Sequence, residues 1–490
     1  MGKRGPWLLF WLTRAVGLCL DTVLTGLAYL AAVILRFDFQ EPSWGWRATA
    51  LSFVTVWVAQ MLALMVTGCY RLPWRRTNAL DLPRYAAAFG LSALVLAFLR
   101  RLLPDLSLAH VRPPYSITLI STVLAFCAVL GIRVLWRYYS EARRNEKSLL
   151  RRTERTMGGS AVLEMLRGKT VLVTGAGGTI GSEIVRQVAC NGAKRVIMVE
   201  RTENALYEID REMRGMGVNA ACIPEMADIA DEHRMRRVLA EWKPQIVLHA
   251  AAYKHVPMVE ANPLDGLRNN ALATRRLGEW CSAAGVERFV MISTDKAVNP
   301  VSVMGMTKRL AEVLLLGLNA KASTIFSCVR FGNVLGSSGS VVPLFREQIE
   351  HRGPVTVTHP EMKRYFMSVE EAVGLVLEAA VMGNGCIYTL DMGEPVKIVD
   401  LAEDMIRQAG YKPYVDVPIV FTGIRAGEKL FEELDVSEKN AYRTGHARIF
   451  VCKVAGRGDD VTIDEVESLI ESHPDDDSVK EFLRRRVGAA

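Results

Sequence analysis

Apolar residues dominate the first third of the chain, where they form four long runs separated by polar segments. The runs cover residues 15–35, 48–66, 85–99 and 117–135, and the third is the shortest. A helix needs about 20 apolar residues to cross the hydrocarbon core of a bilayer. The pattern therefore predicts a transmembrane domain of four helices over residues 1–136. Because apolar runs recur after the first one, we interpret the first as a retained helix and not as a cleaved signal peptide.

One carboxylate, Asp21, lies inside the first apolar run. An ionisable residue at membrane depth is a candidate functional group by default. The alternative is a protonated or hydrogen-bonded aspartate at an interface between helices. We favour this structural interpretation, because four helices with one acid are a thin basis for a transporter.

Basic residues flank the apolar runs. Lys3, Arg4 and Arg14 precede the first run, four arginines lie between the second and third, and residues 137–167 form a basic juxtamembrane linker. By the positive-inside rule this distribution places both termini in the cytoplasm, although three arginines between the third and fourth runs argue against it. The linker also suits an anionic lipid surface. The sequence thus predicts a multi-pass protein in the lipid bilayer, with its remaining domain facing the cytoplasm.

After residue 168, short β-branched runs alternate with amphipathic helical stretches. This alternation predicts an α/β fold with a doubly wound parallel sheet. The first strand, VLVT, runs into a turn in which Gly175, Gly178 and Gly181 have the GxxGxxG spacing. Glycines there let the backbone, with Thr179 and Ile180, approach a pyrophosphate at the N-terminus of the next helix. We therefore predict a dinucleotide cofactor bound at this turn.

A second strand, RVIMVE, ends at Glu200, at the distance of about 20 residues where an acid can bind the adenosine ribose. Such an acid repels the 2′-phosphate of NADP, so NAD is favoured, although Arg201 would have the opposite effect. A surface acid at a strand end is the alternative for Glu200. The small residues Ala250, Ala251 and Ala252 would let the chain pass close to the cofactor, or would serve packing alone.

The stretch with the most candidate chemistry covers residues 293–308, STDKAVNPVSVMGMTK, and follows the strand RFVMI. Short-chain dehydrogenases place a Tyr four residues before a Lys, so that both lie on one helix face. Here Met304 takes the Tyr position and Lys308 remains. Since a thioether cannot exchange a proton, we predict the proton chemistry at Thr294, Asp295 and Lys296. A solvated ion pair of the last two on a loop is the alternative.

Together these motifs resemble the membrane-bound UDP-N-acetylhexosamine 4,6-dehydratases of bacterial polysaccharide and protein-glycan biosynthesis, a branch of the extended short-chain dehydrogenases. The resemblance covers the four apolar runs and residues 168–450. It implies NAD as cofactor, UDP-N-acetylglucosamine or another UDP-N-acetylhexosamine as substrate, and a smaller C-terminal substrate-binding part. It further implies a location in the bacterial inner membrane and a tendency to form homo-oligomers.

The resemblance also assigns roles to individual residues. Asp295 is implied as the acid that protonates the leaving 6-hydroxyl, Lys296 as the base at sugar C5, and Thr294 as a hydrogen-bond partner of the C4 oxygen. Lys308 is implied as a ligand of the nicotinamide ribose, while Met304 leaves the C4 hydroxyl without its usual proton acceptor. The other implied ligands are Asp228 and Ile229 for adenine, and Lys254, His255, Asn333, Arg364, Arg425 and Glu428 for the nucleotide sugar.

Composition narrows the remaining possibilities. The formal net charge of +7 is explained by arginines near the apolar runs, so we predict no nucleic-acid partner. The nine cysteines are scattered without CxxC spacing, so no metal site is expected. Residues 168–455 are predicted as the catalytic domain, and residues 456–490 as a peripheral helical tail.

Two other functions fit parts of this pattern. A UDP-sugar 4-epimerase shares the fold, but it needs the Tyr and has no use for an elimination acid. A catalytically inert, membrane-tethered protein that binds nucleotide sugars would explain the lost Tyr, but not the retained STDK sequence. We therefore favour an NAD-dependent dehydratase, which is a hydro-lyase.

Overall fold

The described part of the chain divides into two compact units, of which the first holds four long helices and the second holds a large sheet. The computed structural model describes residues 6–38, 40, 42, 45–70, 82–102, 114–144, 159–434, 441–452 and 461–487. Residues 145–158 of the predicted linker, and the boundary predicted between residues 455 and 456, lie outside the described residues.

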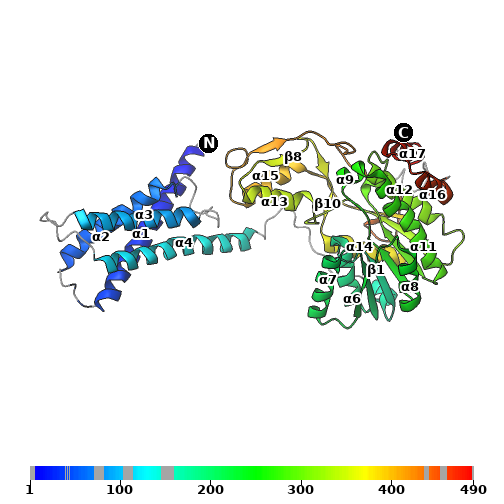
Figure 1. Cartoon of the computed structure of the whole chain (residues 1–490), viewed down its shortest axis with the longest axis horizontal. Helices are drawn as coiled ribbons and strands as arrows, with labels where there is room; N and C mark the ends of the chain where they lie inside the picture. Colours follow the sequence, from blue (N-terminus) through cyan, green and yellow to red (C-terminus); the bar gives the residue numbers. More distant parts are fainter. Residues whose placement is uncertain are drawn as a thin grey trace. The chain divides into compact units, whose positions relative to one another are not determined.

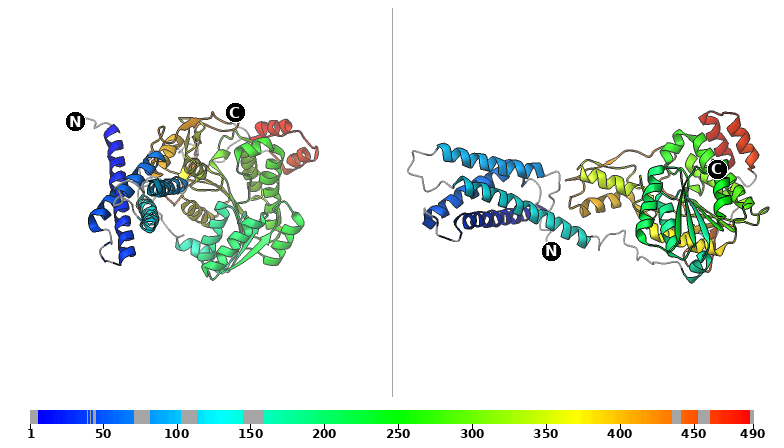
Figure 2. Two further views of the ribbon diagram at one scale, coloured as in Figure 1. Left: turned by 60° about the vertical axis from the view of Figure 1, so that its left-hand side comes forward. Right: turned by 60° about the horizontal axis from the view of Figure 1, so that its bottom comes forward.

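The helical unit consists of α1 (Pro6–Phe37), α2 (Gly45–Val66), α3 (Leu82–Leu102) and α4 (Tyr115–Arg144) (Figures 1 and 2). Each contains a segment long and apolar enough to cross a membrane, which confirms the four predicted helices. The third segment covers Leu82–Arg101 and is longer than predicted, because the helix continues through Arg100 and Arg101. Long basic side chains at a helix end can reach the polar interface while their stems stay in apolar surroundings.

Many large aliphatic residues of this unit point outward, and its fully buried residues include several smaller ones. Ala32, Ala125 and Val129 are fully buried, whereas Leu94 and Leu119 are 70% and 65% exposed. Lipid tails are as apolar as leucine, so helices in a bilayer associate through close packing and polar contacts and not through hydrophobic burial. The distribution is the one expected of a helix bundle surrounded by lipid.

Asp21 lies between α1 and α4 and is fully buried. It accepts a hydrogen bond from the Arg133 guanidinium at 2.7 Å and one from the Tyr70 hydroxyl at 2.9 Å. The structural interpretation of Asp21 is therefore correct in placing it at a helix interface. Its partner, an arginine within the fourth apolar run, was not expected from the sequence.

The second unit is built on a nine-stranded sheet with the order β14-β15-β11-β6-β5-β4-β1-β2-β3. Its strands are β1 (Thr170–Thr174), β2 (Arg195–Glu200), β3 (Ala221–Met226), β4 (Ile246–His249), β5 (Arg288–Ile292), β6 (Ile325–Arg330), β11 (Ile387–Leu390), β14 (Ala441–Arg443) and β15 (Ile449–Cys452). The seven strands from β11 to β3 in this order are parallel to one another. Strand β15 is antiparallel to β11, and β14 is antiparallel to β15. The strand order reverses at β1, which is where doubly wound sheets bind their ligands.

Helices cover both faces of this sheet, as Figure 2 shows. One face is covered by α6 (Thr179–Cys190), α7 (Glu203–Met216) and α14 (Val369–Met382), and the other by α8 (Glu232–Trp242), α11 (Ala273–Ala283) and α12 (Val303–Leu316). Strand residues alternate between these two cores: Val171 and Val173 belong to the first and Leu172 to the second. Because both faces are covered, each parallel strand reads as a continuous apolar run. The predicted doubly wound sheet is confirmed.

The chain after β6 adds a smaller part made of short strand pairs, in agreement with the predicted smaller C-terminal part. The pairs are β7 (Asn333–Val334) with β10 (Phe366–Met367), β9 (Lys363–Arg364) with β12 (Val396–Lys397), and β8 (Val355–Val357) with β13 (Ile419–Phe421). Helices α13 (Val341–Glu350) and α15 (Ile398–Gln408) lie beside β8 in Figure 1. The remaining helices are short: α5 (Ser160–Leu166), α9 (Val256–Ala261), α10 (Pro263–Gly266), η4 (Leu267–Leu272) and η5 (Asp295–Ala297).

The C-terminal tail forms two helices, α16 (Ile463–Glu471) and α17 (Asp476–Val487). Val466, Val479 and Leu483 are fully buried and belong to the same core as α11 and α12. Apolar residues four positions apart give each helix one buried face. The tail is therefore packed against the second unit through these faces, and its predicted peripheral role stays a prediction.

Candidate active site

The glycine-rich turn between β1 and α6 forms one wall of a cleft. Gly175 has a φ of +65°, and a Cβ on it would lie 2.8 Å from the Ala251 nitrogen. A Cβ on Gly181 would overlap the carbonyl oxygen of Gly175. Because glycine is required at both positions, the backbone stays open to a ligand at the N-terminus of α6. This is the cradle that a dinucleotide pyrophosphate needs.

Two adjoining cavities of about 730 and 200 Å³ lie along this turn. Every residue predicted to bind the cofactor lines at least one of them. Thr179, Ile180, Gly181 and Lys308 line the larger, Glu200, Arg201, Asp228, Ile229 and Ala251 the smaller, and Gly175, Gly178, Ala250 and Ala252 both. The structure thus brings these residues together in one cleft, and their contacts with a cofactor stay predictions.

Glu200 ends β2 at the smaller cavity, where the backbone holds its carboxylate. Its two oxygens accept hydrogen bonds from three backbone N–H groups at 3.0–3.2 Å. The Arg201 guanidinium lies over the Tyr253 ring, donates to the Tyr253 hydroxyl at 2.8 Å and is 3.7 Å from Asp228. The fixed anion of Glu200 disfavours a 2′-phosphate, and Asp228 partly compensates the positive charge of Arg201.

The loop after β5, residues 293–296, which we term the STDK loop, places an acid and a base at the larger cavity. Lys296 Nζ donates to Asp295 Oδ1 at 2.9 Å, and the Thr294 hydroxyl donates to the same oxygen at 2.9 Å. The Asp295 side chain is fully buried and that of Lys296 is 19% exposed. Asp295 Oδ2 is buried and has no hydrogen-bond partner among the described residues. The alternative of a solvated surface pair is therefore wrong.

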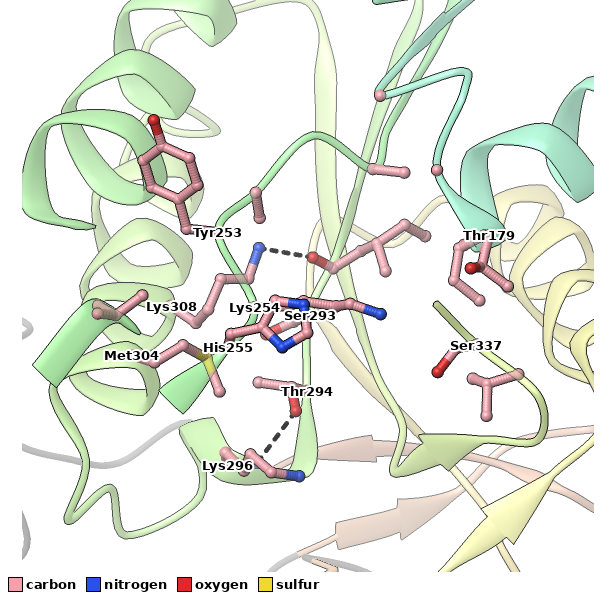
Figure 3. A pocket seen from close by; sticks show the side chains of 18 of the residues that line it. Thr179, Tyr253, Lys254, His255, Ser293, Thr294, Lys296, Met304, Lys308 and Ser337 are labelled. Atoms are coloured by element: carbon pink, nitrogen blue, oxygen red, sulfur yellow. Dashed lines mark hydrogen bonds between the residues drawn. The ribbon is translucent and has the colours of Figure 1, made fainter. Parts of the chain in front are cut away.

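Helix α12 carries Lys308 and Met304 along the same wall of this cavity, opposite Thr179 and Ser337 (Figure 3). Lys308 is 5% exposed, and its Nζ donates to the Ile292 carbonyl oxygen at 2.7 Å. Burial lowers the pKa of Lys308 to about 8. Met304 is buried at the position where a short-chain dehydrogenase has its tyrosine. Proton transfer at that position is thus impossible.

Behind this wall lies a buried charge network centred on Glu312. Its carboxylate accepts hydrogen bonds from the Ser293 hydroxyl at 2.6 Å and from Arg330 at 2.8 and 2.5 Å, and Arg309 approaches to 3.4 Å. Burial acts to raise the pKa of Glu312, but the two guanidiniums and the hydroxyl outweigh it and hold the pKa below its usual value. The network joins α12, β6 and the STDK loop, and so fixes how Lys308 faces the cavity.

Sequence reasoning missed this network. Its signal was a charged residue inside each of two apolar stretches, Glu312 in α12 and Arg330 in β6. Charged side chains are almost never fully buried unless they are paired. Two such residues of opposite sign therefore predict a partner for each other, although not the place where they meet.

Three of the predicted substrate ligands, Lys254, His255 and Asn333, line the larger cavity. Lys254 Nζ donates to the Ser338 carbonyl oxygen at 2.8 Å, and burial lowers the pKa of Lys254. Asn333 Oδ1 accepts from Lys296 Nζ at 3.3 Å. Asn333 therefore reaches the acid–base pair directly, and the substrate contacts of all three residues stay predictions.

The other three predicted substrate ligands, Arg364, Arg425 and Glu428, line neither of the two cavities. Arg364 is buried and donates to the carbonyl oxygens of Lys429 and Leu430 at 2.7 and 3.2 Å. Arg425 is exposed to solvent. The Arg364 guanidinium therefore holds the backbone of residues 425–430, which we term the RAGEKL segment, in place. The binding roles of the three residues stay predictions.

The chain that directly follows the RAGEKL segment brings an acid to the site that sequence reasoning did not single out. Glu432 is buried, and its Oε1 lies 3.9 Å from Lys296 Nζ. The two residues are far apart in the sequence, so only the tertiary fold shows that they meet. Among the residues that the structure describes, no group of three or more His, Cys, Asp or Glu side chains is arranged to hold a metal ion.

Residues 171–454 match a protein family described as polysaccharide biosynthesis proteins. The chain is 49% identical over 290 residues to the probable polysaccharide biosynthesis protein EpsC of Bacillus subtilis (strain 168), which covers 59% of this chain and 48% of EpsC. The chain thus spans about half the length of such curated relatives.

A more distant relative is the UDP-N-acetylglucosamine 4,6-dehydratase (inverting) of Campylobacter jejuni, 32% identical over 286 residues, or 57% of this chain and 81% of that protein. UDP-glucose 4-epimerases match at 31% identity. Among solved structures, Pen from Bacillus thuringiensis matches with a TM-score of 0.54 and 30% identity, covering 63% of this chain and 99% of that one. These names include two different reactions, so the residues of the site must discriminate between them.

Proposed function

The chain belongs to the polysaccharide biosynthesis protein family, and from this premise we propose that it is an NAD-dependent UDP-N-acetylhexosamine 4,6-dehydratase acting on UDP-N-acetylglucosamine. The observation that carries the proposal is the buried Asp295–Lys296 pair at a cavity where Met304 replaces the tyrosine. Elimination of water needs both an acid and a base. The Campylobacter jejuni relative, whose name states this activity, supports the proposal.

The residues of the cleft fit NAD. The turn at Gly175 and Gly181 has no room for side chains and leaves backbone for a pyrophosphate, and Glu200 offers a fixed carboxylate to a ribose. Bound NAD supplies the acceptor for the hydride from sugar C4 and the donor for its return at C6. Lys308 would bind the nicotinamide ribose and add positive potential near C4.

Two proton transfers fall to the Asp295–Lys296 pair. One proton first moves from Lys296 Nζ to Asp295 along the 2.9 Å hydrogen bond, which leaves a neutral amine and a neutral acid. A substrate that fills the cavity and excludes water would favour this neutral form. Lys296 then takes the C5 proton, and Asp295 gives its proton to the 6-hydroxyl, which leaves as water. The ion pair is thereby restored. When the hydride returns to C6, Lys296 would give a proton to C5, and the proton released earlier from the C4 hydroxyl, or one from water, would replace it.

The position of Met304 distinguishes this reaction from epimerisation. A 4-epimerase needs a proton acceptor for the C4 hydroxyl at the tyrosine position, and the buried thioether offers none. Thr294, whose hydroxyl bonds to Asp295 Oδ1 at 2.9 Å, would bind the C4 oxygen. If the C4 proton passes to Asp295, Lys296 must release its own proton to water; otherwise the C4 proton passes to a water molecule.

The deciding experiment incubates detergent-solubilised full-length protein with UDP-N-acetylglucosamine deuterated at C4, followed by mass spectrometry and NMR. We expect loss of one water, with the deuterium at C6. Inversion at C4 with unchanged mass would establish an epimerase instead. Unchanged substrate, also with other UDP-N-acetylhexosamines, would favour an inert binding protein. As controls, Asp295→Asn and Lys296→Met should each abolish dehydration while NAD still binds.

We also propose that the four helices cross a bacterial inner membrane and that the catalytic unit faces the cytoplasm. Their length and apolar composition, and the basic residues before the first helix, support this orientation. A fluorescent protein fused to the C-terminus should fluoresce, whereas alkaline phosphatase fused there should be inactive. The reverse pattern would place the catalytic unit outside the cytoplasm. Homo-oligomer formation stays a prediction from the family resemblance.

A further inference from the structure

A third carboxylate, Glu432, faces the Asp295–Lys296 pair. Its Oε1 lies 3.9 Å from Lys296 Nζ and 3.8 Å from Arg364 Nε, and its side chain is 4% exposed. Its Oε2 is buried and has no hydrogen-bond partner among the described residues. A charge at this distance from an amine is too far for a normal hydrogen bond, but close enough to stabilise the protonated amine.

The chain on both sides of Glu432 is fastened to the segment that follows the STDK loop. Lys429 Nζ donates to the Val298 carbonyl oxygen at 3.1 Å. Glu433 Oε2 accepts from Asn299 Nδ2 at 2.7 Å. These contacts fix Glu432 beside the acid–base pair without using its carboxyl group. The geometry thus keeps one ionisable group next to Lys296, with Arg364 as its second charged neighbour and with one carboxyl oxygen that makes no hydrogen bond to the described residues.

The surrounding charges act on Glu432 in opposite directions. Burial raises the pKa of Glu432 most, Lys296 opposes this, Asp295 adds to it, and Arg364 and Lys429 act to lower the pKa. The net result is a raised pKa. The carboxyl group therefore stays protonated to a higher pH than an ordinary glutamate, and it ionises when the pH rises through that raised value.

We propose that Glu432 is a positioning residue that sets whether Lys296 carries a proton, an inference that rests on the proposed dehydratase function. While Glu432 is protonated, Lys296 has one anionic partner and can pass its proton to Asp295. Once Glu432 is ionised, two carboxylates face one ammonium, and the amine cannot accept the C5 proton. Glu432 itself keeps its protonation state during turnover, because the protons of the reaction move only among the sugar, Lys296, Asp295 and water.

The first test measures the protonation of Lys296 without turnover. Full-length protein is trace-labelled with acetic anhydride over a pH series, and acetylation of Lys296 relative to the exposed Lys321 is measured by peptide mass spectrometry. Only the neutral amine reacts. In Glu432→Gln we expect the labelling midpoint at lower pH, with about tenfold more labelling at a fixed pH below it. Glu433→Gln is the matched control, because the glutamine keeps a side-chain oxygen that can accept from Asn299 Nδ2, and it should label as the wild type does. Equal midpoints in all three proteins would overturn the proposal.

The second test follows dehydration against pH. The kcat of the wild type and of Glu433→Gln should fall at high pH, as Glu432 ionises. This fall should be absent in Glu432→Gln and present in Glu432→Asp, which keeps a carboxyl group. If kcat of Glu432→Gln still fell at high pH, or were reduced equally at every pH, the role of Glu432 would be overturned and the proposed dehydratase function would stand. If no protein dehydrates the substrate, the proposed function fails, and the labelling midpoints still decide the role of Glu432.

Discussion

Among the described residues, the helical unit and the second unit each bury one pair of an aspartate with a basic residue, and the two pairs differ in their base. Arg133 and Asp21 are 2.7 Å apart, and Lys296 and Asp295 are 2.9 Å apart. Both aspartates are fully buried, and each has one carboxylate oxygen without a hydrogen-bond partner among the described residues. The acids are thus nearly equivalent, and the bases are not.

The difference between the bases decides what each pair can do. A guanidinium keeps its charge in proteins, whereas an amine can lose its proton when it is buried. Arg133 also donates to the Val129 carbonyl oxygen at 2.8 Å and lies over the Tyr85 ring, so its position is fixed by several partners. Lys296 borders a cavity of about 730 Å³. The arginine pair therefore offsets buried charge in the membrane, and the lysine pair can move a proton.

Exchanging the base is the most severe test of this comparison. Lys296→Arg keeps the positive charge beside Asp295 but removes the amine that can become neutral. We expect the fold and NAD binding to be retained and kcat to fall about 10³-fold, the range in which loss of a general base lies. Turnover of the C4-deuterated substrate, followed by mass spectrometry, measures this. A variant with more than a tenth of the wild-type rate would show that Lys296 acts only through its charge.

Breaking the membrane pair should cost stability and leave the chemistry unchanged. Asp21→Asn leaves the Arg133 guanidinium buried without a counter-ion, and we expect a loss of about 3–5 kcal/mol in unfolding free energy. Arg133→Met should cost less, because the Tyr70 hydroxyl still donates a hydrogen bond to Asp21. Thermal unfolding of the full chain in detergent micelles compares the two. Equal losses, or a changed kcat in the folded fraction, would contradict the assignment of a structural role.

The two pairs also show what the sequence encodes locally. Asp295 and Lys296 are neighbours at the end of a strand, so a short motif was sufficient to predict them. Asp21 and Arg133 are 112 positions apart, and the pattern of four apolar runs does not predict which helices pack together. Sequence reasoning therefore predicted a buried Asp21 at a helix interface but not its partner.

The same limit explains the acids that were missed around the site. The glycine turn and the strand ends of the cleft were predictable, because doubly wound sheets place ligands at the strand order reversal. Glu312 and Glu432 reach the site through packing of α12 against β6 and through the RAGEKL segment, which are tertiary contacts. Arg364 was predicted as a substrate ligand from the resemblance, but the sequence did not reveal that its guanidinium donates to backbone carbonyl oxygens.

Lys308 sharpens the comparison, because it is a buried amine bonded to a carbonyl oxygen and not to a carboxylate. Its pKa is lowered from 10.5 to about 8. Between pH 8 and pH 10.5, Lys308 is protonated in the unfolded chain but neutral in the folded chain. The free energy of unfolding of the wild type should therefore rise with pH relative to that of Lys308→Met, by at most about 3 kcal/mol. Chemical denaturation at pH 7 and pH 10 measures the difference between the two proteins. A constant difference would mean that Lys308 is not discharged in the folded state.

The smallest expected effects come from removing one hydroxyl beside each pair. The Tyr70 hydroxyl donates to Asp21 and the Thr294 hydroxyl to Asp295, both at 2.9 Å. Loss of such a bond is worth about 1 kcal/mol when its acceptor keeps another donor. In Tyr70→Phe this loss should appear in the unfolding free energy with kcat unchanged. In Thr294→Val it should appear as a several-fold lower kcat with a nearly unchanged unfolding temperature. If both variants lost only stability, the Asp295–Lys296 pair would be as structural as the membrane pair, and the proton transfers would have to be sought elsewhere in the cleft.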